Sequence, residues 1–347
     1  MRVPLCCLAV LLPGVAAAEF SGYGPLPARN FQPIQLIFLN LPVERARALG
    51  EGEFALRVET AEINEIATDN PPTEALLDFE TNRTVLGATV GVRPGLEVGL
   101  DVPFLSRYGG FLDPLINGVE DFVGAKNPER EVYPANHFSG FRVWRDDLTL
   151  FEGPKQYLEL GDLWGSAKYE VWHRERWPLV SLRAAIKAPT GRAGGVYGSG
   201  KWDVGLGVAA EYPILSRLIA YGNVALIYPG GPITDAHLTL NPIVTQSLAF
   251  EGYVGAGVSL LLQQDLYTSP MHGTGTAVLD GDVVELALGV NWAIGPCLVQ
   301  FGGINNVSAV ISAADFTLQL RVVYRGRAWG TPAPAASPPG EEAPTGP

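Results

Sequence analysis

Residues Val283–Ile294 read VVELALGVNWAI, and apolar and polar side chains alternate along this stretch. In an extended chain Leu286, Leu288 and Val290 fall on one face, whereas Glu285 and Asn291 fall on the other. A period of two predicts a β-strand whose two faces meet different surroundings. A soluble β-sandwich shows the same alternation, so the fold class depends on the rest of the chain.

The same alternation recurs in LEVGLDVPF (96–104), in DFTLQLRVVYR (315–325) and in further segments. It predicts twelve strands, near 53–65, 80–92, 96–105, 161–172, 178–189, 203–213, 217–228, 242–252, 256–267, 283–294, 297–305 and 315–325. Residues 217–228 alternate poorly, so ten or fourteen strands stay open. An even number is typical of single-chain bacterial barrels, whose two ends both lie on the periplasmic side.

The connections between these strands are of two kinds. Short turns such as 93–95, 214–217 and 295–296 alternate with longer loops rich in Gly, Pro, Ser and Asn. Short periplasmic turns and long outer loops are typical of outer-membrane proteins. Beyond the N-terminus no apolar run reaches the roughly 18 residues of a membrane-spanning helix. The sequence therefore predicts an all-β fold, a transmembrane antiparallel β-barrel.

Aromatic residues fall near both predicted membrane boundaries, where amphipathic rings anchor a barrel in outer-membrane lipid. The predicted girdle on the short-turn side holds Trp172, Trp177, Tyr212, Tyr253, Trp292 and Tyr324, and that on the long-loop side holds Phe104, Tyr108, Tyr228, Tyr267 and Phe316.

The N-terminus reads MRVPLCCLAVLLPGVAAAEF, with Arg2 before an apolar stretch and small residues at 16–18. This pattern predicts a signal peptide over 1–18, cleaved after Ala18, and export to the bacterial outer membrane. Residues 19–50 are apolar and punctuated by proline; we expect them to pack into the lumen or to lie on the periplasmic rim. The barrel spans 51–326. The Pro-rich tail, 327–347, is predicted to be disordered and available to a periplasmic partner.

The longest loop, 107–160, is predicted to cap or narrow the outer mouth. A short helix is expected near 112–124, with an apolar face made by Leu112, Leu115, Ile116, Val119, Phe122 and Val123. The segment FRVWRDDLTLFEG resembles an extra hairpin that turns at Asp146 and Asp147.

Several short motifs carry a resemblance to a known family: YGPLPARN, GGFLDPLI, GDLWGSAKYE, KAPTG, LYTSP and AADFTLQLRVVYR. Together they resemble an uncharacterised family of proteobacterial outer-membrane β-barrels, a domain of unknown function, from about Tyr23 to Arg325. The chain is also distantly similar to outer-membrane barrels linked to aromatic-compound degradation. This resemblance implies uptake of hydrophobic or aromatic compounds and supplies no catalytic or binding residues.

Charged residues recur on the faces predicted to point inward. They are Arg57, Glu59, Arg83, Glu97, Asp101, Lys168, Glu170, Arg183, Lys187, Asp203, Glu211, Asp265, Glu285 and Arg321. Either they form a polar lumen that biases solute passage, or they form a salt-bridged plug, because buried charges must pair or stay hydrated. Acidic residues outnumber basic ones in this set, which indicates a mild preference for cations.

An enzyme, a metal site and a cofactor site are not expected. His137, His173, His237 and His272 belong to no recognisable catalytic or metal-ligating arrangement. The stretch GGVYGSGKWD (194–203) comes close to a phosphate-binding loop, but Trp202 stands where that loop needs Ser or Thr. We therefore interpret it as a glycine-rich outer loop. A formal net charge of −12 argues against nucleic-acid binding.

The leading hypothesis is a monomeric outer-membrane barrel that forms a narrow or gated channel for a small, partly hydrophobic solute. Residues 19–50 and the helix-bearing loop would form its gate. The alternatives are an outer-membrane structural or interaction anchor and, less favoured, an outer-membrane lipid hydrolase.

Overall fold

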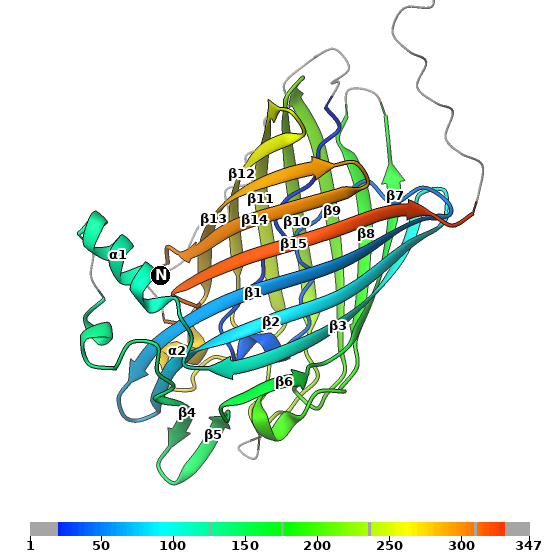
Figure 1. The fold of residues 1–347 in the computed structure, drawn as a ribbon. Helices are drawn as coiled ribbons and strands as arrows, with labels where there is room; N and C mark the ends of the chain where they lie inside the picture. Colours follow the sequence, from blue (N-terminus) through cyan, green and yellow to red (C-terminus); the bar gives the residue numbers. More distant parts are fainter. Residues whose placement is uncertain (1–19, 125–126, 175–176, 235–236, 309–310, 330–347) are drawn as a thin grey trace, which may run out of the picture.

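The computed structural model describes residues 20–124, 127–174, 177–234, 237–308 and 311–329, and within them the chain forms a closed antiparallel barrel (Figure 1). The predicted signal peptide and residues 330–347 of the predicted tail lie outside the described residues. The prediction of twelve strands is confirmed, because β1 pairs with β15 from Glu53↔Arg327 to Asn64↔Phe316 and closes the ring. The barrel strands are β1 (Glu53–Asp69), β2 (Glu74–Arg93), β3 (Leu96–Tyr108), β7 (Trp164–Trp172), β8 (Leu179–Lys187), β9 (Asp203–Leu215), β10 (Leu218–Tyr228), β11 (Ile243–Gly255), β12 (Val258–Tyr267), β13 (Val283–Ile294), β14 (Cys297–Asn306) and β15 (Phe316–Arg327).

The two faces of each strand differ as the alternation predicted. In β13, Leu286, Leu288 and Trp292 are exposed, whereas Glu285 and Asn291 are buried inside the barrel. Aliphatic side chains on the outside and polar ones inside suit a barrel surrounded by lipid. Among the described residues, no helix is long and apolar enough to cross a membrane.

The ends of the barrel are unlike each other. Turns of a few residues join β2 to β3, β9 to β10, β11 to β12 and β13 to β14 at one end, which also holds the start of β1 and the end of β15. We call this the short-turn end; in an outer membrane it faces the periplasm. The longer connections meet at the opposite end, the loop end. There β1 and β2, with 17 and 20 residues, run past the other strands.

The long loop between β3 and β7 contains a helix and a hairpin, as predicted. They are α1 (Asp113–Val123), followed by η2 (Pro128–Glu131), and the strands β4 (Gly140–Arg145) and β5 (Leu148–Glu152). Proline in its first turn and Gly124 at φ 73° mark the two ends of α1. A further strand, β6 (Gln156–Leu160), pairs with β3 and was not predicted.

The predicted apolar face of α1 is divided in the structure. Leu112 and Ile116 are buried, whereas Leu115, Val119 and Phe122 are exposed. In Figure 1 the helix lies beside the loop end of the barrel, at the left of the view. The remaining elements are the short helices η1 (Gln35–Ile37), η3 (Ala193–Gly195) and α2 (Ala277–Asp280).

Most of the predicted girdle residues lie on the outer surface. Trp172, Trp177, Tyr228, Trp292 and Tyr324 are exposed, and Phe104, Tyr108, Tyr212 and Phe316 are partly exposed.

The girdle prediction is wrong for Tyr253 and Tyr267, which point into the barrel. Tyr253 stacks on Phe20 with ring centroids 4.8 Å apart, and Tyr267 is buried. The period of two explains both positions. Each tyrosine follows an inward-facing acid, Glu251 or Asp265, by two residues and therefore shares its face.

Candidate functional site

The lumen is occupied by residues 20–49, which we call the lumenal segment. The blue chain inside the barrel in Figure 1 is this segment. Its first residues pack beside Tyr253 near the short-turn end, and it reaches η1 under the outer loops before it returns toward β1. We refer to residues 20–34 as the rising leg and to residues 38–49 as the returning leg.

A buried carboxylate, Glu251 of β11, holds the start of the rising leg. It accepts hydrogen bonds from the backbone amides of Tyr23 and Gly24 at 3.0 and 3.1 Å. The side chains of Tyr221, Ser259 and Asn291 donate to the same carboxylate. Five donors therefore converge on one charge in a site that is fully buried. The sequence-based set of lumen residues missed Glu251, although the alternation of β11 places it inward.

Leu26 of the rising leg sits in a gap made by two glycines. A Cβ atom at Gly289 would lie 2.7 Å from the Leu26 side chain, and one at Gly302 would lie closer still. The Gln263 side chain brackets the same residue, accepting from its amide at 3.1 Å and donating to its carbonyl at 3.0 Å. Because Gly289 and Gly302 have no side chains, they leave room between their strands and the lumen axis, and Leu26 packs into this room.

The returning leg is held by acids that the sequence predicted to face the lumen. Asp203 accepts from the amide of Leu39 at 2.8 Å, and Glu211 accepts from that of Ala46 at 3.1 Å. Glu170 and Glu97 accept from the amides of Ala48 and Leu49, each at 2.6 Å. These carboxylates serve the backbone of the segment, which carries no secondary-structure ladder of its own here.

All fourteen residues predicted to face the lumen lie on the inward faces of their strands. Eleven are buried, and Arg57, Glu170 and Arg321 are partly exposed. Several form ion pairs: Arg57 with Asp101, Arg83 with Glu59 at 3.4 Å, Lys168 with Glu97 at 2.8 Å, and Lys187 with Asp203 at 3.3 Å.

Asp265 and Glu285 form no ion pair with any of the described residues. They are cross-strand partners, and Asp265 accepts from Ser247 and Gln263. Part of the predicted set is thus salt-bridged, and part accepts hydrogen bonds from the lumenal segment.

A row of cavities runs between the two legs and one side of the barrel. The first, about 70 Å³, is lined by Pro27 and Arg29 of the rising leg, by residues 41–44 of the returning leg, and by strands β1, β2, β3, β7, β8 and β15. A second, about 100 Å³, shares Arg57, Lys168 and Arg321 with the first. A third, about 510 Å³, shares Arg47 and Arg325 with the second and lies at the short-turn end. Neighbouring cavities share walls, so the row leads from that end into the barrel.

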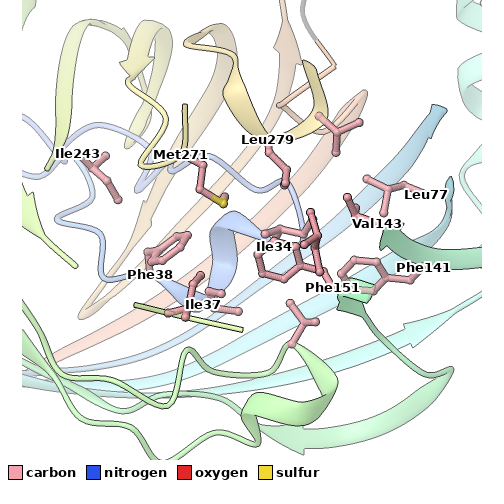
Figure 2. Packing of buried hydrophobic residues seen from close by; sticks show 14 of the residues in the cluster. Ile34, Ile37, Phe38, Leu77, Phe141, Val143, Phe151, Ile243, Met271 and Leu279 are labelled. Carbon is pink, nitrogen blue, oxygen red and sulfur yellow. The ribbon is translucent and has the colours of Figure 1, made fainter. Parts of the chain in front are cut away.

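Toward the loop end the row narrows. The next cavity is only about 10 Å³, and Arg29, Arg83, Asp162 and Lys187 line it together with apolar residues such as Leu36 and Phe38. Beyond it lies an apolar cluster that we call the cap (Figure 2). The cap contains Ile37 and Phe38 of the lumenal segment and Phe141, Val143 and Phe151 of the β4–β5 hairpin. It also contains Leu77, Ile243, Met271 and Leu279 from the barrel and other loops. The cap thus fills the interior of the barrel with apolar side chains beneath the outer loops.

Two buried cations tie the cap to the barrel. The guanidinium of Arg107, at the end of β3, donates to the carbonyls of Gly195 and Val196 and lies over the rings of Phe141 and Tyr197. Lys187 donates to the carbonyl of Ile37 at 2.8 Å, to Asp162 at 2.5 Å and to Ser199 at 2.7 Å.

The GGVYGSGKWD stretch is therefore a loop whose backbone helps to hold the cap, and β9 follows it directly. Arg107 was not among the predicted residues because the predicted strand ended at 105. The alternation of inward and outward residues continues after Leu105, and it would have placed Arg107 on the inward face of β3.

The four histidines are all exposed and lie on four different connections of the barrel. Within the ranges that the structure describes, no three His, Cys, Asp or Glu side chains are grouped so as to hold a metal ion.

Comparison with protein families gives one match that covers nearly the whole chain. A family model described as a protein of unknown function, DUF3187, matches residues 3–325. The chain belongs to this family. The resemblance to an uncharacterised family of outer-membrane barrels is thereby confirmed. A comparison of this DUF3187 protein with curated proteins found no match.

Solved structures similar to this DUF3187 protein are outer-membrane barrels. One is the COG4313 outer membrane channel from Pseudomonas putida F1, with a TM-score of 0.57 and 14% identity over 81% of this chain and 98% of that one. The CymD monoaromatic hydrocarbon channel gives a TM-score of 0.39 and 13% identity over 91% of this chain and 100% of that one. A Pseudomonas aeruginosa FadL homologue gives 0.37 and 9% over 79% and 88%. The first match shows the fold; the other two are too distant to support an argument.

Proposed function

We propose that this protein is a gated outer-membrane channel that passes a small, partly hydrophobic solute through its lumen. The observation that supports the proposal is the row of cavities between the lumenal segment and the barrel wall, which begins at the short-turn end and stops beneath the cap. Charged side chains and apolar ones such as Val43, Val85 and Trp164 line the row together. The similar COG4313 structure is that of a channel, which is consistent with this proposal.

The gate in this proposal is the cap with η1 beneath it. Nine of the 22 buried residues of the cap belong to loops or to the β4–β5 hairpin. The hairpin pairs with the barrel at only five positions of β2, from Glu74↔Trp144 to Asp78↔Gly140. Opening it therefore leaves the twelve-stranded ladder intact. Loops and short hairpins are the parts of a protein that open at the lowest free energy.

The test is planar-bilayer conductance of a protein without the tip of the hairpin. Because Arg142 and Glu152 are cross-strand partners, residues 142–152 are replaced by an Asn-Gly turn that keeps the register. We expect larger or more frequent channel events than in the unaltered protein, since Val143, Leu150 and Phe151 leave the cap. The matched control removes α1, which contributes no residue to the cap. Silence of both the unaltered and the hairpin-deleted protein would contradict the channel proposal.

The two alternative functions have tests of their own. A lipid hydrolase predicts ester or phospholipid cleavage that falls when His237 and His272 are replaced by alanine. An anchor predicts a crosslinked partner whose recovery depends on the loop 107–160 or on the C-terminal tail. The exposed, separate positions of the histidines give the hydrolase alternative no support.

A further inference from the structure

The charges that line the cavities are strongly unequal. The walls of the two inner cavities contain nine cationic side chains, Arg29, Arg45, Arg47, Arg57, Arg83, Lys168, Arg183, Arg321 and Arg325, and four anionic ones, Glu44, Glu59, Glu97 and Asp101. A mild preference for cations was expected from the excess of acidic residues in the predicted lumen set. The walls of the two inner cavities do not support it, because cationic side chains outnumber anionic ones there. Asp203, Glu211, Asp265 and Glu285 do not line either cavity.

Each of the four acids is already paired with a cation. Glu44 lies 2.5 Å from Arg183 and 3.2 Å from Lys168, and Lys168 also contacts Glu97 at 2.8 Å. Asp101 pairs with Arg57, and Glu59 pairs with Arg83 at 3.4 Å. These pairs neutralise the acids and leave other cations in excess.

Arg45 and Arg47 pair with Glu211, at 2.9 and 3.7 Å, so the excess cations are Arg29, Arg321 and Arg325. Arg29 is buried, and its Nη2 donates to the carbonyls of Gln35 and Phe38, while its Nε has no hydrogen-bond partner among the residues that the structure describes. Arg321 donates to Gln300 at 2.7 Å, its Nε also lacks a hydrogen bond, and its nearest carboxylate oxygen, on Glu59, is 4.0 Å away. Arg325 forms no ion pair among the described residues. The cavities thus contain guanidinium groups with donors to spare.

We infer that the lumen binds and conducts small organic anions, namely carboxylates with an apolar body; this rests on the proposed channel function. Guanidinium groups bind carboxylates through paired, charge-assisted hydrogen bonds. The same walls offer Pro27, Leu41, Val85 and Trp164 to the apolar part of the solute. Charges of one sign in a narrow cleft with low-dielectric walls enrich the opposite ion.

The decisive measurement is the reversal potential of the hairpin-shortened channel in a potassium chloride gradient, repeated with potassium benzoate. We expect anions to carry the current, with a permeability ratio over potassium of about 10. The double substitution Arg321→Gln and Arg325→Gln removes two excess cations and should bring this ratio close to 1. The control is Arg174→Gln in the same shortened protein, because Arg174 is exposed on the connection between β7 and β8 and lines neither inner cavity. A cation-selective or unselective current would overturn the inference and leave the channel function standing.

Binding to the closed protein provides a second measurement that needs no conductance. Benzoate should raise the thermal unfolding midpoint of the detergent-solubilised protein above that in chloride of the same ionic strength, because a ligand of the folded state stabilises it. The shift should vanish in the Arg321→Gln, Arg325→Gln protein and persist in the Arg174→Gln protein. If the channel is silent but this shift is present, the channel function fails and the anion site stands. If benzoate and chloride give the same midpoint in the unaltered protein, the anion site is refuted.

Discussion

The lumenal segment meets two sides of the barrel in two different ways. Strands β11–β14 grip the rising leg through Glu251, Gln263 and the glycine gap around Leu26, and almost all of the side chains involved are fully buried. We call this side the sealed wall. Strands β1, β2, β3 and β7 face the segment across the row of cavities, through arginines, a lysine and paired acids. We call this side the basic wall.

The difference shows how one strand pattern can give two functions. All these strands alternate apolar and polar residues, so the outside of the barrel is similar on both sides. On the sealed wall, glycines and a buried carboxylate leave little space around the rising leg, whereas on the basic wall the charged side chains contact the returning leg and also line cavities beside it. The sealed wall therefore fixes the segment, and the basic wall leaves a route beside it.

The largest effect is expected from removing the charge that fixes the rising leg. Glu251→Gln leaves five donors around an amide that can satisfy only part of them, so we expect the free energy of unfolding to fall by about 3 kcal/mol. The rising leg should become open to protease at the short-turn end. Denaturant unfolding in detergent and limited proteolysis measure the two effects.

The matched control for this change lies on the basic wall. Glu97→Gln also removes a buried carboxylate that accepts from the segment, yet Lys168 keeps Glu44 as a partner and the adjoining cavity can admit water. We expect a loss of only about 1 kcal/mol. Equal losses at Glu251 and Glu97 would remove the distinction between the walls.

A smaller effect is expected from filling the glycine gap. In Gly302→Val the new side chain overlaps Leu26, which is fully buried, and we expect a loss of about 2 kcal/mol. Gly222→Val is the control, because a Cβ atom there meets nothing within 4 Å. Adding Leu26→Ala to Gly302→Val should recover part of the loss, and a double-mutant cycle measures the coupling. Strict additivity would show that Leu26 does not pack against Gly302.

The barrel was predictable from the sequence because its signal is local. Alternation along each strand, short turns such as 93–95 and the apolar outer positions of β13 need no knowledge of distant residues. The helix in the long loop and the hairpin at Asp146 and Asp147 were predictable for the same reason, since each depends on periodicity or on turn residues.

The site was less predictable, because it depends on which strands the lumenal segment contacts. The inward positions of the charged residues follow from alternation, but nothing local assigns Glu211 to a backbone amide and Arg321 to a cavity. Tyr253 and Tyr267 were placed in the girdle by their aromatic character, although their position after Glu251 and Asp265 indicated the inward face. Arg107 was left out of the predicted lumen residues because the sequence defines the end of a strand poorly.

The smallest effect on stability is expected at the loop end, in a cluster of charged residues that belongs to neither wall. Asp315, just before β15, lies 2.9 Å from Arg130, which also contacts Asp113 and Glu120. Burial raises the pKa of Asp315 to about 7; Arg130 opposes this shift, and Glu129 and Glu120 add to it. A carboxyl whose pKa is raised by folding contributes stability below its ordinary pKa of about 4, and this contribution is lost as the pH rises through about 7.

Hydrogen exchange in the loops around Arg130 and Asp315 should therefore be faster at pH 8 than at pH 5, after correction for the intrinsic rates, while the sealed wall stays equally protected. The Asp315→Asn protein has no group to titrate at this position and should lose the difference. If its loops still loosen at pH 8, Asp315 is not the group responsible, and Glu65, whose pKa is also raised by burial, is the next carboxyl to replace. If the sealed wall loosens together with the loops, the loop end and the sealed wall open as one unit, and the cap could not act as an independent gate.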